Sequence, residues 1–312
     1  MIDPIEFFGN HIYRMVFFGT SVIGLVAGAL GSFAYLRKQS LISDVIAHAA
    51  LPGTLVAFLA AVVVLGVDGR NMLGLVVGAV VTGTLAAMFA NSIAARTKIR
   101  IDTAMAVSLT VFFGAGMILL RIISNGPFTG KGGINDYLFG NASVITIADL
   151  ITSTAVGAVA LVLMLLFWKE FALRTFDPIL STVLGFRARV IDTLMFATIV
   201  IAIVIGVKAV GIVLMIAFVV TPPAAARQWT SSLPSLVVLS GAFGAIGSGV
   251  GAYLSVVLGN VPTGPLIVLT LFVMFLISLL LSPRRSVITT ILRRARAREA
   301  LRRELLTETS ER

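Results

Sequence analysis

Long apolar runs are the feature that most restricts what this chain can fold into. A helix needs about 20 mainly apolar residues to cross the hydrocarbon layer of a membrane. The runs are Tyr13–Leu36, Asp44–Val67, Met72–Ala94, Ala104–Ile123, Val144–Trp168, Val190–Gly206, the shorter Val210–Ala226, Leu233–Leu258 and Pro265–Leu281. Together with 58% hydrophobic and only 12% charged residues, they predict an all-α, polytopic membrane protein. We expect nine transmembrane helices, or eight if Val210–Ala226 only re-enters.

The positive charges predict how these spans are oriented. Short cytoplasmic loops retain Lys and Arg, and in this sequence these residues gather in alternate loops. The exceptions are Arg14, Arg70, Arg121, Lys131 and Lys208. We therefore expect an extracytoplasmic segment over residues 1–12, a transmembrane domain over residues 13–282 and a basic cytoplasmic tail over residues 283–312. The formal net charge of +10 then reflects membrane topology, and no nucleic-acid partner is expected.

The stretch SLISDVIAHAALPG, residues 40–53, places an acid and a histidine in an expected span. Asp44 and His48 are four residues apart, so both project from one helix face. Ionisable groups inside a membrane are costly and commonly line an ion or proton path, and oxygen with imidazole suits a divalent transition metal. Pro52, four residues beyond His48, is expected to loosen the helix. The alternative is structural, with Asp44 capping the span and His48 hydrogen-bonding a carbonyl.

Two negative findings limit the chemistry. The sequence has no cysteine, so a metal site must use carboxylates, imidazole, carbonyls or water. The Gly-rich segment GPFTGKGG lacks the spacing, the Ser or Thr after Lys131, and the preceding strand of a phosphate-binding loop. We therefore expect no enzyme activity in this chain, and any ATP hydrolysis must come from a separate subunit.

The longest internal cytoplasmic segment, Lys169–Arg189, contains the start and stop signals of a short helix. Asp177 can cap it, Pro178 suits its first position, and Gly185 suits the position just past its end. Such a helix on the inner face fits a docking element. An ordinary amphipathic connector would show the same spacing.

A second irregular stretch, Ala209–Arg227, runs apolar into Pro222 and Pro223. This composition predicts a helix break inside or at the edge of the membrane, as in many transporters. A simple helix end at the cytoplasmic face is the alternative. Small residues four apart, such as Gly24 and Gly28 or Gly74 and Gly78, predict close helix packing.

Four motifs in order carry a family resemblance. They are SLISDVIAHAALPG, FDPILSTVLGF, AVGIVLMIAFVVTPPAAAR and NVPTGPLIVL. Over roughly residues 13–285, the chain resembles the membrane permease subunits of metal-ion ABC importers, the ABC-3 type permeases that take up manganese, zinc or iron in bacteria. The resemblance implies the helical fold of vitamin B12-type (type II) importers in the cytoplasmic (inner) membrane.

The resemblance also implies partners and site residues. It implies a homo- or heterodimer of permeases, ABC ATPase subunits on the cytoplasmic face and an extracytoplasmic metal-binding protein. The transported ion would be Mn²⁺ first, or Zn²⁺ or Fe²⁺, held transiently by Asp44 and His48, with no permanently bound cofactor. The implied coupling residues are Asp177, Pro178, Leu180, Leu184 and Gly185. The chain departs from the family pattern at Ser43 and Val45, which flank the acid, and at Ile101, where many relatives have a second acid, so no ligand role passes to Asp102.

Two function classes therefore compete. The first is the permease subunit of an ATP-driven importer. The second is a self-sufficient secondary transporter or channel that uses Asp44 and His48 as an ion relay. Secondary carriers tend to repeat their hydropathy pattern, and the Asp-x-x-x-His stretch has no second copy. Copurification of an ATPase would separate the two classes.

Overall fold

A computed structural model describes residues 4–37, 41–64, 66, 72–128, 146–211, 214–259 and 261–282. All the elements in these ranges are helices. They are α1 (Pro4–Gly9), α2 (His11–Leu36), α3 (Leu41–Leu59) with a π-helical extension (Ala60–Val64), α4 (Met72–Arg96), α5 (Ile101–Asn125), α7 (Ile147–Leu166), α8 (Trp168–Phe176), α9 (Pro178–Val183), α10 (Ala188–Val210), α11 (Met215–Arg227), α12 (Leu233–Leu258) and α13 (Thr263–Leu281). The basic tail over residues 283–312 and most of the GPFTGKGG segment lie outside the described residues.

Eight of the described helices are long and apolar enough to cross a membrane, namely α2, α3 with its extension, α4, α5, α7, α10, α12 and α13. This confirms an all-α, polytopic membrane protein. The run Val210–Ala226 instead contains the last residue of α10 and all but the last residue of the 13-residue helix α11. At 1.5 Å per residue, α11 is roughly 20 Å long, which is shorter than the hydrocarbon layer. The ninth run is therefore not a full-length span by itself.

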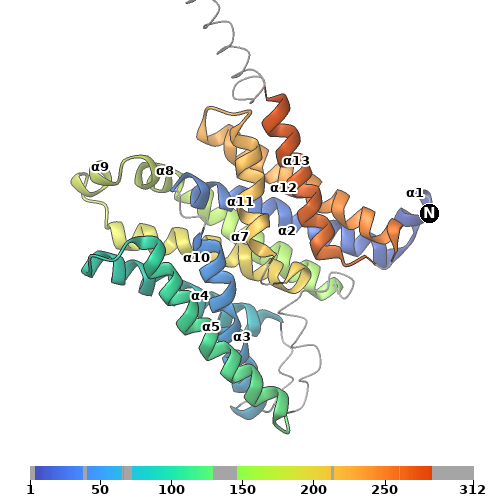
Figure 1. Ribbon diagram of the computed structural model, residues 1–312, viewed down its shortest axis with the longest axis horizontal. Helices are drawn as coiled ribbons and strands as arrows, with labels where there is room; N and C mark the ends of the chain where they lie inside the picture. The colour runs from blue at the N-terminus through green and yellow to red at the C-terminus, as the bar shows by residue number, and fades with distance from the viewer. Residues whose placement is uncertain are drawn as a thin grey trace, which may run out of the picture.

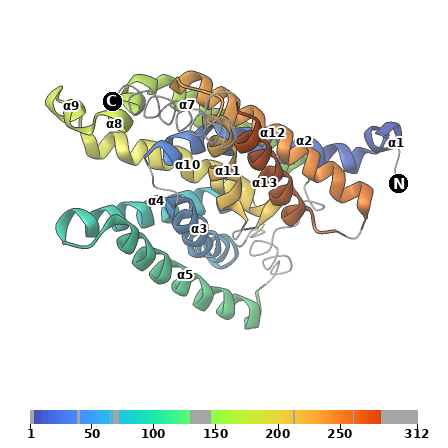
Figure 2. The same cartoon turned by 45° about the horizontal axis from the view of Figure 1, so that its top comes forward.

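The helices form two groups (Figures 1 and 2). Helices α3, α4 and α5 pack against one another, while α2 packs mainly against α12 and contacts α7, α10 and α11. Helix α10 joins the groups because it contacts both α2 and α4. Helix α9 and the N-terminal helix α1 lie at opposite ends of the molecule in both views. One end of the molecule therefore carries α9, and the opposite end carries α1.

Small residues set the tightest helix contacts, as the sequence predicted. A Cβ atom on Gly24 or Gly28 of α2 would clash with backbone oxygens of α12, those of Gly244 and Ser240. A Cβ atom on Gly78 of α4 would clash with the carbonyl oxygen of Gly53 in α3. Gly74 has open space instead, so the spacing correctly identified an interface but only one of the two α4 glycines belongs to it.

The helix break expected at Pro222 and Pro223 is wrong, and Pro52 does not interrupt its helix. Helix α3 runs through Pro52, and α11 runs through both Pro222 and Pro223 to Arg227. A proline removes one backbone donor, but in lipid no water competes for the remaining hydrogen bonds, so the helical backbone persists. The interruption lies upstream instead, where α10 ends at Val210 and its C-cap residue Gly211 has φ +89°.

Candidate functional site

Asp44 and His48 meet on one face of α3, near its N-terminal end. His48 Nδ1 lies 3.1 Å from Asp44 Oδ1 and 2.9 Å from the main-chain oxygen of Asp44. The side chains are 16% and 32% exposed for His48 and Asp44, respectively, so the pair is accessible from one side. The sequence therefore placed the two groups together correctly. The carbonyl contact foreseen in the structural alternative is also present.

Helix α5 supplies the wall beside this pair. The ring of Phe113 meets the His48 imidazole edge to face, with ring centroids 4.8 Å apart. One turn along α3, Leu51 and Pro52 pack at Gly116 of α5, where an added Cβ would lie 3.0 Å from each. Gly53 and Gly116 thus allow α4 and α5 to approach α3 closely. The close approach of α5 brings the Phe113 ring against the imidazole. The contact with Phe113 had no signal in the sequence.

Within the part of the chain that the structure describes, no third ionisable ligand accompanies the pair. Across the described ranges, no group of three or more His, Asp and Glu side chains is arranged to hold a metal ion. If both side chains contacted an ion, most of its coordination shell would be left to water. Such an arrangement holds an ion weakly, as a transport path requires.

The short helix expected between Asp177 and Gly185 is α9, and a second helix that was not expected, α8, precedes it. Asp177 Oδ1 accepts a hydrogen bond from the Leu180 backbone N–H at 2.8 Å, and Pro178 is the first residue of α9. The N–H groups of Gly185 and Phe186 donate to the carbonyls of Thr182 and Ser181, which is a Schellman ending. Gly185 has φ +83°, where a side chain is strained. Each of the three signals in the sequence thus has its expected structural role.

The exposed face of α9 is apolar. Ile179, Leu180, Val183 and Leu184 are 77%, 43%, 76% and 58% exposed, respectively. Isolated exposed apolar residues are common, but a contiguous group of them indicates an interaction surface. In Figures 1 and 2, α9 also projects from one end of the molecule.

An ion-pair network that sequence reasoning missed holds these short helices to the spans. Asp192 of α10 accepts hydrogen bonds from Arg174 of α8 and from Arg37 at the end of α2. Arg174 Nη1 also donates to the main-chain oxygen of Pro178 in α9, at 3.2 Å. Hydrogen bonding to Asp192 raises the pKa of Arg174 above its ordinary value, so this guanidinium stays charged. An acid near the start of an apolar run was the available signal.

Comparison with known proteins identifies the family to which this chain belongs. Residues 10–282 match the family described as the ABC 3 transport family. The chain belongs to that family. It is 38% identical to the zinc transport system membrane protein TroC of Treponema pallidum, over 93% of this chain and 95% of TroC. It is 37% identical to the manganese transport system membrane protein MntC of Bacillus subtilis, over 93% of this chain and 66% of MntC.

Solved structures agree with the assignment to this family. The structure described as PsaBC from Streptococcus pneumoniae in complex with Fab matches with a TM-score of 0.78 and 31% identity, over 91% of this chain and 98% of that chain. An inward-facing putative metal-chelate type ABC transporter matches with a TM-score of 0.59 and 14% identity, which supports the fold alone. The chain therefore has the fold of an ABC transporter permease, as its motifs predicted.

Proposed function

We propose that this chain is the membrane permease subunit of an ATP-driven importer of divalent metal ions. Manganese is the first candidate and zinc or iron the next, because the similar proteins are named for manganese and zinc transport. The observation that carries the proposal is the contact between Asp44 and His48 within a span. A carboxylate and an imidazole are costly inside a membrane, so they are rare there and commonly line a path for an ion or a proton.

In this proposal Asp44 and His48 ligate the metal transiently on its way through. In the neutral tautomer that carries its proton on Nε2, the Nδ1 lone pair of His48 is free, and Nδ1 lies 3.1 Å from Asp44 Oδ1, so one ion could contact both groups. The Phe113 ring orients the imidazole, as groups around metal-binding histidines generally do. Asp44 supplies the negative charge, and water completes the shell.

Two substitutions test the pair. Asp44→Asn keeps size and removes charge, and His48→Gln keeps a donor and removes the imidazole. Each should abolish manganese or zinc uptake in cells, while assembly with the ATPase is unchanged. Asp102→Asn is the matched control, because Asp102 is an exposed acid at the start of α5 whose nearest Arg100 nitrogen lies 4.0 Å away. Uptake that persists in the Asp44→Asn, His48→Gln double variant, or loss of folding in either variant, would show that the pair is structural.

The two ends of the molecule take different partners in this proposal. The apolar residues of α9, together with Asp177, Pro178 and Gly185, form the coupling site for ABC ATPase subunits. A metal-loaded binding protein docks at the opposite, extracytoplasmic end, and a second permease completes the transporter in the cytoplasmic membrane. The C-terminus is then cytoplasmic. The arginines at the ends of α2, α4 and α8 and at the start of α10 support this orientation.

The secondary-carrier alternative is tested by purification and reconstitution. An ATPase that copurifies with the chain, and uptake into proteoliposomes that requires ATP, would support the importer. Uptake driven by a proton gradient through the chain alone would overturn it.

A further inference from the structure

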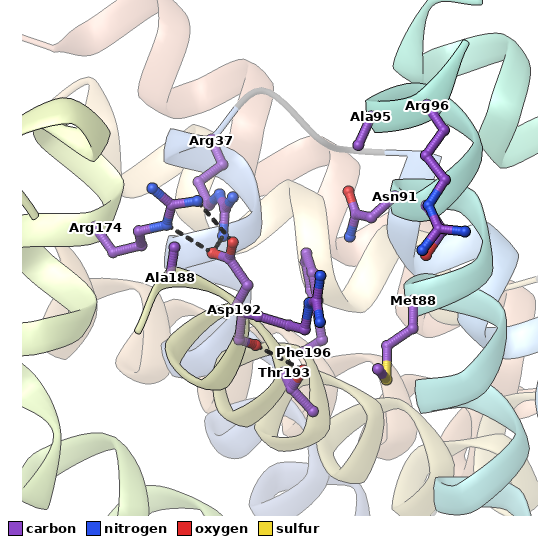
Figure 3. A pocket seen from close by; sticks show the side chains of 12 residues that line it. Arg37, Met88, Asn91, Ala95, Arg96, Arg174, Ala188, Asp192, Thr193 and Phe196 are labelled. Atoms are coloured by element: carbon purple, nitrogen blue, oxygen red, sulfur yellow. Dashed lines mark hydrogen bonds and ion pairs between the residues drawn. The ribbon is translucent and has the colours of Figure 1, made fainter. Parts of the chain in front are cut away.

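A polar pocket of about 540 Å³ opens beside the ion-pair network, where the ends of α2, α4, α8 and α10 converge. Figure 3 shows Arg37 and Arg174 turned toward Asp192 on one side, with Asn91 and Arg96 of α4 on the other side. None of these groups belongs to the Asp44 and His48 site. The pocket has no role in the metal path proposed above.

The pocket is strongly positive. Four arginines and one carboxylate line it, Arg37, Arg96, Arg174, Arg189 and Asp192, so positive charges exceed negative ones by three. Asp192 is already bound by Arg37 and Arg174 at 2.8 Å each. Arg96 and Arg189 are exposed, and neither has a carboxylate partner within the part of the chain that the structure describes. Two guanidinium groups on facing helices are thus available to an anion.

This charge pattern excludes a second metal site. A cation entering the pocket would meet four guanidinium groups, and the single carboxylate already carries two of them. An anion would instead relieve the repulsion between the arginines. The Asn91 amide, which has no hydrogen-bond partner in the described ranges, adds a neutral donor on the α4 wall.

The position and the residue type identify the ligand. The pocket lies where the candidate spans α2 and α4 end and α10 begins, which is the depth of phospholipid head groups. Guanidinium groups present paired donors that match the oxygens of a phosphate group. Basic pockets between transmembrane helices are suited to anionic head groups. Met88, Ala95 and Phe196 supply apolar lining beside the arginines.

We propose that this pocket binds a phosphate group through Arg96 and Arg189. The phosphate is carried by an anionic phospholipid such as phosphatidylglycerol, or is free in the cytoplasm. This inference does not depend on which ion the permease carries.

Thermal unfolding of the purified, lipid-depleted permease in detergent tests the proposal. Inorganic phosphate or phosphatidylglycerol, at constant ionic strength, should raise the midpoint by about 2 °C or more at saturation. Phosphatidylcholine, which has no net charge, should not. Stabilisation by phosphatidylglycerol alone assigns the lipid as the source, and stabilisation by phosphate alone assigns the soluble anion. If neither raises the midpoint, the proposal is overturned.

Variants connect the effect to the pocket. Arg96→Gln with Arg189→Gln should remove the shift. Arg100→Gln is the matched control, because Arg100 follows α4 on the same side, is 87% exposed and is outside the pocket lining. If the double variant does not fold, Arg96→Lys and Arg189→Lys keep the charge but lose the paired donors, and each should reduce the shift. A shift that survives in the pocket variants, or that Arg100→Gln reduces equally, overturns the assignment.

An acidic side chain of the ATPase is the competing occupant. In that case the double Gln variant would lose the ATPase during copurification while the phosphate-induced shift remained. That combination would also overturn the proposal.

Discussion

Arg174 of α8 and Asp192 of α10 form a two-point ion pair, with Nη2 2.8 Å from Oδ2 and Nε 3.1 Å from Oδ1. Both side chains are mostly buried, at 16% and 20% exposed. Because Asp192 also binds Arg37, and Arg174 also binds the Pro178 carbonyl, this pair links α9 to the end of α2. Helix α3, which carries Asp44 and His48, begins shortly after that end.

Asp192→Asn should therefore destabilise the protein. It leaves two mostly buried guanidinium groups facing each other without a counter-charge, at a cost of about 1–3 kcal/mol. The thermal midpoint should fall by several degrees in detergent. Asp102→Asn should change it little, because the Arg100–Asp102 pair is exposed and 4.0 Å apart. Equal midpoints for both variants would show that the Asp192 network is not a structural joint.

Two glycines of α4 provide a controlled test of helix packing. Gly78→Ala places a Cβ against the Gly53 carbonyl oxygen of α3, whereas Gly74→Ala meets nothing within 4 Å. Alanine favours a helix over glycine by about 1 kcal/mol, so Gly74→Ala should be neutral or stabilising. Gly78→Ala should lower the thermal midpoint because α3 and α4 must separate. The opposite order of the two midpoints would contradict the packing described for α3 and α4.

The ends of α9 should matter for coupling rather than for folding. Gly185→Val forces a side chain into the φ +83° conformation, at a cost of about 1–2 kcal/mol, and Pro178→Ala frees the first turn. The double variant should retain ATPase activity but lose its link to uptake. The measurement is ions transported per ATP hydrolysed in proteoliposomes. An unchanged ratio would remove the coupling role of the α9 boundaries.

The spans were predictable because lipid leaves the backbone no hydrogen-bond partner except its own helix. Apolar runs therefore translate almost directly into α2, α4, α5, α7, α10, α12 and α13. The same physics explains why Pro52, Pro222 and Pro223 do not interrupt their helices. Proline rules come from water, which competes for the freed groups, whereas a packed helix in a membrane keeps its remaining bonds.

The candidate site was only half predictable. Asp44 and His48 lie four residues apart, so helix geometry alone brings them together. Phe113 belongs to another helix, and Arg37 binds Asp192 across 155 positions of sequence. Pairings of this kind depend on how whole helices pack, and no local pattern records them. The caps of α9 were predictable because each is decided within a few residues.

The exposed apolar face of α9 leads to the last prediction. Ile179 and Val183, one turn apart on α9, are 77% and 76% exposed, so replacing both with serine should change the thermal midpoint of the isolated permease little. If α9 docks into the ATPase, the same change removes apolar area from the interface and should sharply reduce ATPase copurification. Leu258→Ser is the control, because Leu258 is 58% exposed and ends α12, the end that we place on the extracytoplasmic side. Its copurification should match that of the unmodified chain. Retained ATPase in the α9 variant would mean that the partner binds elsewhere, and an equal loss in both variants would point to a general loss of solubility.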